Sequence, residues 1–357
     1  MSSILILGAS YGSLLATRLS MAGHHVCLVC TPSTAELINR EGTRVRFPVE
    51  GREQPVEVDS RKLPGSITAA APDDAQPAGF DLAILAMQEP QYREEGVRQL
   101  MQRLARVGIP CLAVMNMPPP PFLRRIAGVQ VDALAPCFTD VQPWDRFEPG
   151  RVSLASPDPQ AFRPVGEQKN VLQVGLATNF KCAPFESENH TALLRRLSTD
   201  IENARYEVEG ESLQLPIRLR THDSLFVPLA KWPMLMAGNY RCITDGAPVP
   251  IANAVHDDIE RSRAVYDWVA DLCRALGART EDLVPFEKYA SAAASLKKPS
   301  SAARSLAAGA EHIERVDLLV QSVAAQKGFS HPEVDAIVAR VNEALRRNRA
   351  AGVRLAA

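Results

Sequence analysis

Residues 4–30 read ILILGASYGSLLATRLSMAGHHVCLVC, and their pattern indicates the fold class of the first part of the chain. Four consecutive aliphatic residues, Ile4 to Leu7, predict a strand that is covered on both faces. Gly8 permits a tight turn into a helix that ends at Gly23, and a second strand follows at Val26 to Cys30. This order is typical of dinucleotide-binding folds, because free N–H groups at the helix start can hold a pyrophosphate.

The glycine turn departs from the usual Gly-x-Gly-x-x-Gly spacing. Gly8 occupies the first site, whereas Ser10 and Ser13 stand at the second and third sites, and Gly12 is an additional glycine. A serine at the second site takes up space where backbone approaches phosphate, although its hydroxyl can bind a phosphate oxygen. The alternative is an ordinary turn without a ligand. We expect the cofactor turn to comprise Gly8, Ala9, Ser10, Tyr11, Gly12 and Ser13.

Length and composition indicate a globular chain of two domains. The 357 residues are 46% hydrophobic and carry a net charge of −1, and domains commonly contain about 100 to 200 residues. The scattered basic residues favour neither nucleic-acid nor membrane-surface binding. Because the sequence shows no membrane-spanning run and no charged leader, we expect a cytoplasmic protein.

The cysteines and histidines do not show the spacing of metal sites, so we expect no metal. Cys27 and Cys30 form a Cys-x-x-Cys pair inside the predicted second strand. Side chains three positions apart on a strand point to opposite faces. We therefore predict buried thiols rather than a redox couple.

Strands alternate with helices over the first half of the chain, which predicts a parallel sheet. Helices are expected at 35–40 and 94–106, and strands at 44–49, 56–58, 80–87 and 110–115. The prolines of residues 118–121 predict a rigid turn that excludes helix and strand. Residues 150–155 and 171–182 are expected to form edge strands or hairpins.

Beyond Glu188 the pattern becomes helical. Helices are expected at 188–206, 222–243, 252–277, 300–327 and 331–349. We therefore predict an α/β protein with a doubly wound, Rossmann-like sheet over 1–190. An all-helical domain for substrate binding and dimerisation follows over 191–357, with the boundary within 188–215.

The chain resembles the ketopantoate reductase (2-dehydropantoate 2-reductase) family from end to end. LLATRLSMAGHHVCLV (14–29) and INREGTRVR (38–46) carry the likeness at the start, and PSSAARSLAAG (299–309) with IERVDLLVQSVAAQKG (313–328) at the end. The resemblance implies an NAD(P)H-dependent oxidoreductase that reduces a small 2-oxo acid or related carbonyl, and a homodimer. Departures from the family pattern imply a divergent member. A different substrate fits these departures as well as ketopantoate does.

The resemblance also implies catalytic residues. Lys231, in LAKWPMLMAGNYRC (229–242), matches the family's general-acid lysine, and Asn116 matches an asparagine near nicotinamide and substrate. Asn239 keeps the asparagine eight positions after the lysine, whereas Leu235 replaces the one four positions after it. Hydride transfer builds negative charge on the carbonyl oxygen, which requires a proton donor. The alternatives are a surface lysine and an asparagine that only begins a turn.

Further matches concern cofactor and substrate. Gln88 replaces a cofactor-adjacent lysine while Gln91 is kept, and Thr31 replaces an arginine at the end of the second strand. Since that strand end has no acid, NADP is favoured, with NAD as the alternative.

Ser300 and Ser301 match a serine that touches the substrate carboxylate, with a plain helix cap as the alternative. The family's substrate-binding glutamate falls at Glu311 or His312, and a solvated histidine is the alternative for the latter.

Two other functions fit the same residues. One is an opine-dehydrogenase-like reduction of an imine between an amino acid and a 2-oxo acid. The other is a non-catalytic NADP-binding sensor, which the altered positions would permit.

Overall fold

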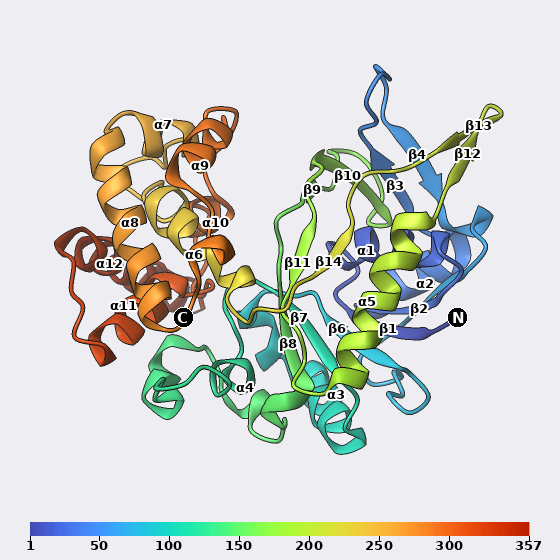
Figure 1. The fold of residues 1–357 in the computed structure, drawn as a ribbon, viewed down its shortest axis with the longest axis horizontal. Coiled ribbons are helices and arrows are strands. Elements are labelled where there is room, and N and C mark those ends of the chain that lie inside the picture. The colour runs from blue at the N-terminus through green and yellow to red at the C-terminus, as the bar shows by residue number, and fades with distance from the viewer. Residues whose placement is uncertain (357) are drawn as a thin grey trace. The chain divides into compact units, whose positions relative to one another are not determined.

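The computed structural model describes residues 1–356, which fall into two compact units (Figure 1). The first unit comprises Met1–Met87, Gln91–Arg125 and Gln142–Asp223. The second comprises Gln88–Pro90, Ile126–Val141 and the chain from Ser224 onward. Short segments of the first half of the sequence therefore belong to the second unit.

An eight-stranded sheet forms the centre of the first unit, in the order β14-β11-β8-β7-β6-β1-β2-β5. Its strands are β1 (Ser3–Leu7), β2 (His25–Val29), β5 (Ser66–Ala70), β6 (Leu82–Leu85), β7 (Cys111–Val114), β8 (Val152–Ser156), β11 (Phe180–Cys182) and β14 (Leu219–Thr221). The strands from β5 across to β8 are parallel to one another, whereas β11 is antiparallel to β8. Taken in chain order, the strands from β5 to β8 follow the 3-2-1-4-5-6 arrangement of dinucleotide-binding domains. The predicted Rossmann-like sheet is confirmed.

Helices of the first unit pack around apolar strands. They are α1 (Gly12–Met21), α2 (Pro32–Glu41), α3 (Glu95–Val107), α4 (Pro120–Leu123) and α5 (Glu188–Asn203). The side chains of residues 4–7 on β1 are fully buried, as predicted for a strand covered on both faces. α5 packs against α1 and β14 within this unit.

A second sheet of the first unit has the order β4-β3-β10-β9. Its strands are β3 (Arg44–Phe47), β4 (Val56–Asp59), β9 (Gln160–Phe162) and β10 (Val171–Leu176), and a separate hairpin joins β12 (Tyr206–Val208) to β13 (Glu211–Leu213). The strands predicted at 44–49 and 56–58 therefore exist outside the parallel sheet. The prediction of edge strands or hairpins is wrong for β8, which lies between β7 and β11. β10 pairs antiparallel with the preceding strand β9, as in a hairpin.

The proline run was expected to exclude helix, and this expectation is wrong. α4 begins at Pro120, with Pro121 as its second residue. Proline fits the first turn of a helix, because the N–H groups there have no intrahelical partner in any case.

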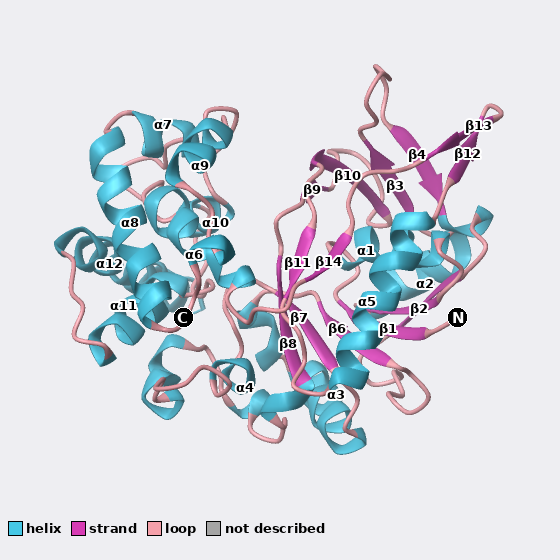
Figure 2. Cartoon of the chain, in the orientation of Figure 1, coloured by secondary structure: helices cyan, strands magenta, loops and turns pink. Residues whose placement is uncertain are grey.

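Helices make up the second unit in the part of the chain that the structure describes (Figure 2). They are α6 (Lys231–Met234), α7 (Ile251–His256), α8 (Ile259–Ala275), α9 (Phe286–Ala293), α10 (Ser301–Ala307), α11 (Val316–Gln326) and α12 (Pro332–Ala356). The long predicted helices are interrupted. Asp258 separates α7 from α8 by accepting a hydrogen bond from the Arg261 N–H at 3.0 Å, as a helix cap does.

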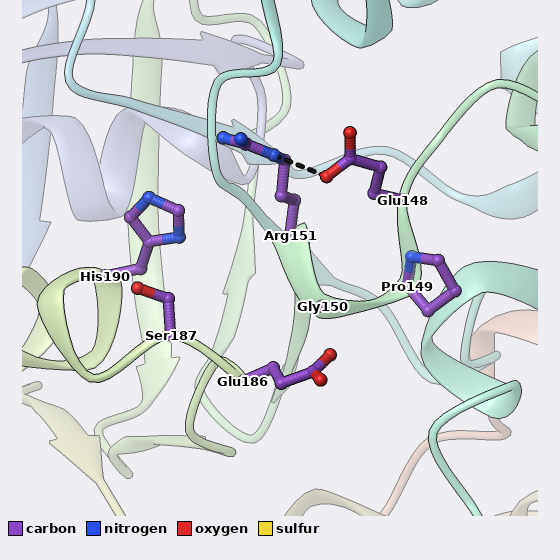
Figure 3. A pocket seen from close by; sticks show the side chains of 7 residues that line it. All are labelled: Glu148, Pro149, Gly150, Arg151, Glu186, Ser187 and His190. Atoms are coloured by element: carbon purple, nitrogen blue, oxygen red, sulfur yellow. Dashed lines mark hydrogen bonds and ion pairs between the residues drawn. The ribbon is translucent and has the colours of Figure 1, made fainter.

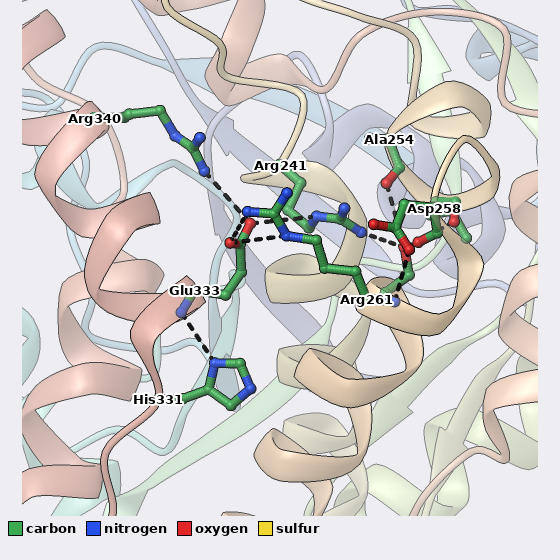
Figure 4. A network of polar contacts seen from close by, with 9 residues as sticks. Arg241, Ala254, Asp258, Arg261, His331, Glu333 and Arg340 are labelled. Atoms are coloured by element: carbon green, nitrogen blue, oxygen red, sulfur yellow. Dashed lines mark hydrogen bonds and ion pairs between the residues drawn. The ribbon is translucent and has the colours of Figure 1, made fainter.

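A buried carboxylate ties three elements of the second unit together. Glu333, at the start of α12, forms ion pairs with Arg241, Arg261 of α8 and Arg340 of α12 (Figure 4). Its side chain is 9% exposed, so these cations compensate the loss of hydration. The network stabilises the packing of α12.

None of the described helices combines the length and apolar character that a membrane crossing needs. All seven cysteines are free thiols, including the Cys27 and Cys30 pair. Among residues 1–356, no group of acidic, histidine and cysteine side chains is arranged to hold a metal ion.

Candidate functional site

The carboxyl ends of β6, β1 and β2 meet at one edge of the large sheet. The Ala86 N–H donates to the Leu7 carbonyl at 2.8 Å, and the Gly8 N–H donates to the Val29 carbonyl at 2.9 Å. Strand order reverses between β1 and β6, because successive strands lie on opposite sides of this point. Open α/β sheets bind ligands at such a point.

At Gly8 and Gly12 a side chain would collide with neighbouring atoms. Gly8 has φ +106°, and a Cβ there would lie 2.6 Å from the Ala86 carbonyl oxygen. A Cβ at Gly12 would lie 2.7 Å from Cγ2 of Ile6. Gly8 thus permits the turn, and Gly12 permits close packing of α1 on β1. Gly12 therefore has the packing role that the third glycine has in the usual motif. The sequence pattern did not predict this role.

The remaining turn residues divide between solvent and interior. Ser10 is exposed, whereas Ser13 is buried and its hydroxyl donates to the Ala9 carbonyl. The Tyr11 hydroxyl donates to the Pro159 carbonyl at 2.7 Å, and burial beside Asp158 raises its pKa well above the usual value. Tyr11 is therefore an anchor of the turn.

The start of α1 fits an anion. Its first turn contains no acidic residue, and Tyr11 at the cap position makes no side-chain capping bond. Backbone N–H groups and the helix dipole at such an end attract phosphate. This helix start fits the diphosphate of a dinucleotide.

Three other predicted cofactor residues lie in the first unit. Thr31 is exposed directly before α2, and its hydroxyl donates to Oγ1 of Thr34 at 2.9 Å. Asn116 is half-buried two residues beyond β7, and Gln91 is exposed in a 3-10 turn. Thr31 and Asn116 thus follow strands whose carboxyl ends lie at the edge that carries the glycine turn. Gln88 is exposed and belongs to the second unit.

Lys231 is the first residue of α6, and an irregular helix continues from it. A 3-10 turn precedes it at Val227–Ala230, and a π-helical turn follows at Leu235–Asn239. The Tyr240 N–H donates to the Leu235 carbonyl five positions back at 2.9 Å. The single helix predicted over 222–243 is therefore three short pieces.

The π turn brings Lys231 and Asn239 to one face of the helix. Eight residues of regular α-helix would rotate Asn239 by about 80° from Lys231. The additional residue of a π turn removes most of that rotation. Lys231, Met234 and Asn239 are indeed the half-buried positions, while Leu235 lies on the buried side.

Two hydroxyl groups from distant helices support this segment. The Tyr289 hydroxyl of α9 donates to the Met234 carbonyl at 2.9 Å, at the start of the π turn. A Cβ at Gly238 would collide with that hydroxyl. The Ser300 hydroxyl donates to the Asn239 carbonyl at 2.6 Å, at the end of the turn. Sequence reasoning missed Tyr289, because neither its neighbours nor its spacing indicates this contact.

Ser300 also caps α10, since its hydroxyl accepts from the Ala303 N–H at 3.2 Å. Its side chain thus serves the helix start and Asn239 together. Ser301, the first residue of α10, is exposed.

The segment before α11 contains two acids that differ in exposure. Glu311 is exposed and His312 half-buried, whereas Glu314 is buried. The Glu314 carboxylate accepts from the Glu89 N–H at 3.4 Å, and its carbonyl accepts from the Tyr240 hydroxyl at 2.5 Å. Glu314 therefore links this segment to Tyr240, the residue directly after Asn239.

A separate cavity of about 630 Å³ lies in the first unit (Figure 3). It is lined by Glu148, Pro149, Gly150, Arg151, Glu186, Ser187 and His190. Arg151 lies directly before β8 and donates to the Gly108 carbonyl, which precedes β7. The cavity is thus at the amino ends of these strands, away from the glycine turn, and contains none of the predicted site residues.

No protein-family model matches the chain, and no curated protein matches it in sequence. The fold, however, matches solved structures. The structure is similar to 2-dehydropantoate 2-reductase from Methylococcus capsulatus, with a TM-score of 0.67 and 13% identity over 98% of each chain.

Two further structures show the same likeness. D-mandelate dehydrogenase, solved with NADH and anilino(oxo)acetate, matches with a TM-score of 0.65 and 13% identity, over 97% of this chain and 99% of that one. Dimeric ketopantoate reductase from Staphylococcus aureus matches with a TM-score of 0.61 and 11% identity, over 97% and 99%. At these identities the likeness establishes the fold, and the predicted fold of ketopantoate reductases is confirmed.

Proposed function

We propose that the chain is an NAD(P)H-dependent reductase of a small 2-oxo acid or related carbonyl, as a divergent member of the ketopantoate reductase family. The observation that carries this proposal is the start of α1, which has no side-chain cap and no acidic residue and follows the glycine turn at the point where strand order reverses. Dinucleotide-binding domains hold the pyrophosphate at the helix start that follows such a turn.

The first unit supplies the cofactor site in this proposal. Backbone N–H groups at the start of α1 hold the diphosphate, apart from that of Gly12, which donates to the Gly8 carbonyl at 3.0 Å. The exposed hydroxyl of Ser10 adds a further donor. The Asn116 amide, beyond the carboxyl end of β7, orients the nicotinamide or the substrate carbonyl. Reduced nicotinamide, when bound, supplies the hydride.

The second unit supplies the proton. The Lys231 ammonium group donates it to the carbonyl oxygen on which negative charge develops. Asn239 lies on the same helix face and can hold the substrate with its amide. Ser300 positions Asn239 through its carbonyl, and Ser301 offers an exposed hydroxyl to a carboxylate.

The substrate class follows from this chemistry and from the relatives of the fold. A 2-oxo acid places a carbonyl to be reduced beside a carboxylate, and anilino(oxo)acetate in the similar D-mandelate dehydrogenase complex has the same pair of groups. Gln88, Leu235 and His312 alter polar positions of the family pattern. We therefore propose a substrate other than ketopantoate, and a homodimer like the similar Staphylococcus aureus enzyme.

A substrate panel tests the proposal. Purified protein is mixed with NADPH or NADH and a series of 2-oxo acids, ketopantoate included, with and without amino acids. Consumption of reduced nicotinamide with an oxo acid alone is expected. Consumption only when an amino acid is added would favour the imine reductase, and nucleotide binding without consumption would favour the sensor.

A further inference from the structure

The end of β2 is the place where dinucleotide-binding domains distinguish NADP from NAD. A cation near this strand end favours NADP, because it binds the 2′-phosphate of the adenosine ribose. Here the residues directly after β2 are Cys30, Thr31, Pro32 and Ser33, and none is basic. A cation for this position has to come from another part of the chain.

The segment around β9 lies beside the cofactor turn. The hydrogen bond from the Tyr11 hydroxyl to the Pro159 carbonyl, 2.7 Å long, fixes the start of this segment against the turn. Ala161 of β9 packs on the same hydrophobic cluster as Tyr11 and Cys30. Pairing with β10, with Phe162 opposite Gln173, holds the strand in place. Arg163 follows directly at the end of β9.

The charge of Arg163 reaches the end of β2. Burial raises the pKa of the Cys30 thiol to about 11, and the positive charge of Arg163 opposes that rise. This agrees with the packing of β9, because Ala161, two positions before Arg163, and Cys30 pack on the same hydrophobic cluster.

Arg163 is also available for a ligand. Its side chain is exposed, and it makes no hydrogen bond or ion pair with any residue that the structure describes. Arg46, on β3 of the same small sheet, differs because it binds Glu57 at 2.7 Å and Glu167 at 2.8 Å. Asp158, the acid near Tyr11, is paired with Lys181 at 3.5 Å.

The first turn of α2 adds donors of its own. It contains no acidic residue, and the exposed side chain of Ser33 lies within it. An N-terminal helix end with an exposed hydroxyl is a favourable place for a phosphate.

We propose that Arg163 binds the 2′-phosphate of NADPH, together with Ser33, and so makes NADPH the preferred cofactor. The inference rests on the proposed function, because it assumes a dinucleotide at the glycine turn. A guanidinium suits this task, since it can donate two parallel hydrogen bonds to phosphate oxygens.

Nucleotide binding by Arg163→Ala tests the proposal without a turnover assay. Dissociation constants for NADPH and NADH are measured by the fluorescence of the reduced nicotinamide. The Kd for NADPH should rise about 10- to 100-fold, as expected for loss of a charge-assisted contact, while the Kd for NADH stays unchanged. Lys169→Ala is the matched control, because Lys169 is an exposed cation of the same β9–β10 connection, and it should leave both constants unchanged.

The outcomes separate this proposal from the proposed function. Equal changes for the two nucleotides, or no change for NADPH, would overturn the role of Arg163. Wild-type protein that binds NADH as tightly as NADPH would overturn the preference and leave the reductase in place. If wild-type protein bound neither nucleotide, both proposals would fail.

Discussion

The glycine turn of the first unit and the Lys231 segment of the second unit reach a defined geometry by different means. At the turn, the missing side chain of Gly8 leaves room for the Ala86 carbonyl, and that of Gly12 leaves room for the Ile6 side chain. At Lys231, a π turn is supported by Tyr289 and Ser300, which lie more than fifty positions further along the chain. The residues of the first region lie in one continuous stretch of sequence, whereas the second region depends on hydroxyl groups from later helices.

Lys231→Ala separates the two regions most strongly. If Lys231 is the proton donor, kcat should fall by about 10²- to 10⁴-fold, the usual contribution of a general acid. The Kd for NADPH should stay unchanged, because the glycine turn belongs to the first unit. Lys288→Ala, which removes an exposed lysine of α9, is the control and should retain kcat. An unchanged kcat in Lys231→Ala would exclude this acid.

Gly8→Ala perturbs the first region instead. Left-handed backbone costs an alanine about 1–2 kcal/mol, and crowding against the Ala86 carbonyl adds about 1–3 kcal/mol. Denaturant unfolding should show this loss of stability, and the Kd for both reduced nucleotides should rise.

Gly23→Ala is the matched control for Gly8→Ala. Gly23 has φ +85°, but a Cβ there would meet no atom within 4 Å. Only the backbone cost should therefore appear, with nucleotide binding retained. Equal loss of stability and of binding in the two variants would contradict the spatial role of Gly8.

Tyr289→Phe should have the smallest effect of the three. It removes one hydrogen bond at the π turn and should cost about 1 kcal/mol of stability, or somewhat more if the Met234 carbonyl stays unsatisfied. Because the turn aligns Lys231 with Asn239, kcat should fall while the Kd for NADPH is kept.

Tyr266→Phe controls for loss of a phenol in the same aromatic cluster. Tyr266 stacks on Tyr289 with 5.3 Å between ring centroids, but its hydroxyl donates to the Val284 carbonyl at 2.6 Å, outside the π turn. Stability should fall in both variants and kcat only in Tyr289→Phe. The same drop in kcat in both would show a general packing effect.

The regions also differ in how far the sequence predicted them. The first strand, the turn, α1 and β2 were predictable, because one continuous stretch contains the apolar run, the glycines and the helix pattern. β5 was missed, since SITAA is short and contains a single large apolar residue, Ile67. The helix that begins at Pro120 was missed because proline interrupts a helix only in its interior and is favoured at the first position.

The irregular helix around Lys231 was not predictable in the same way. Its apolar periodicity indicates one long helix, whereas the break into 3-10, α and π turns depends on hydroxyl groups from α9 and the start of α10. The resemblance to a known family singled out Lys231 and Asn239. The structure adds the reason why a spacing of eight residues can place them on one face.

The proposed reaction is hydride transfer from a bound nicotinamide to the carbonyl carbon of a 2-oxo acid. It is tested most directly with NADPH that carries deuterium at the transferable position of C4, using the oxo acid selected by the panel. Mass spectrometry of the 2-hydroxy acid should show one deuterium at C2 when the correct face of the nicotinamide is labelled. A product without deuterium from either labelled face, or no product from any oxo acid, would contradict the account.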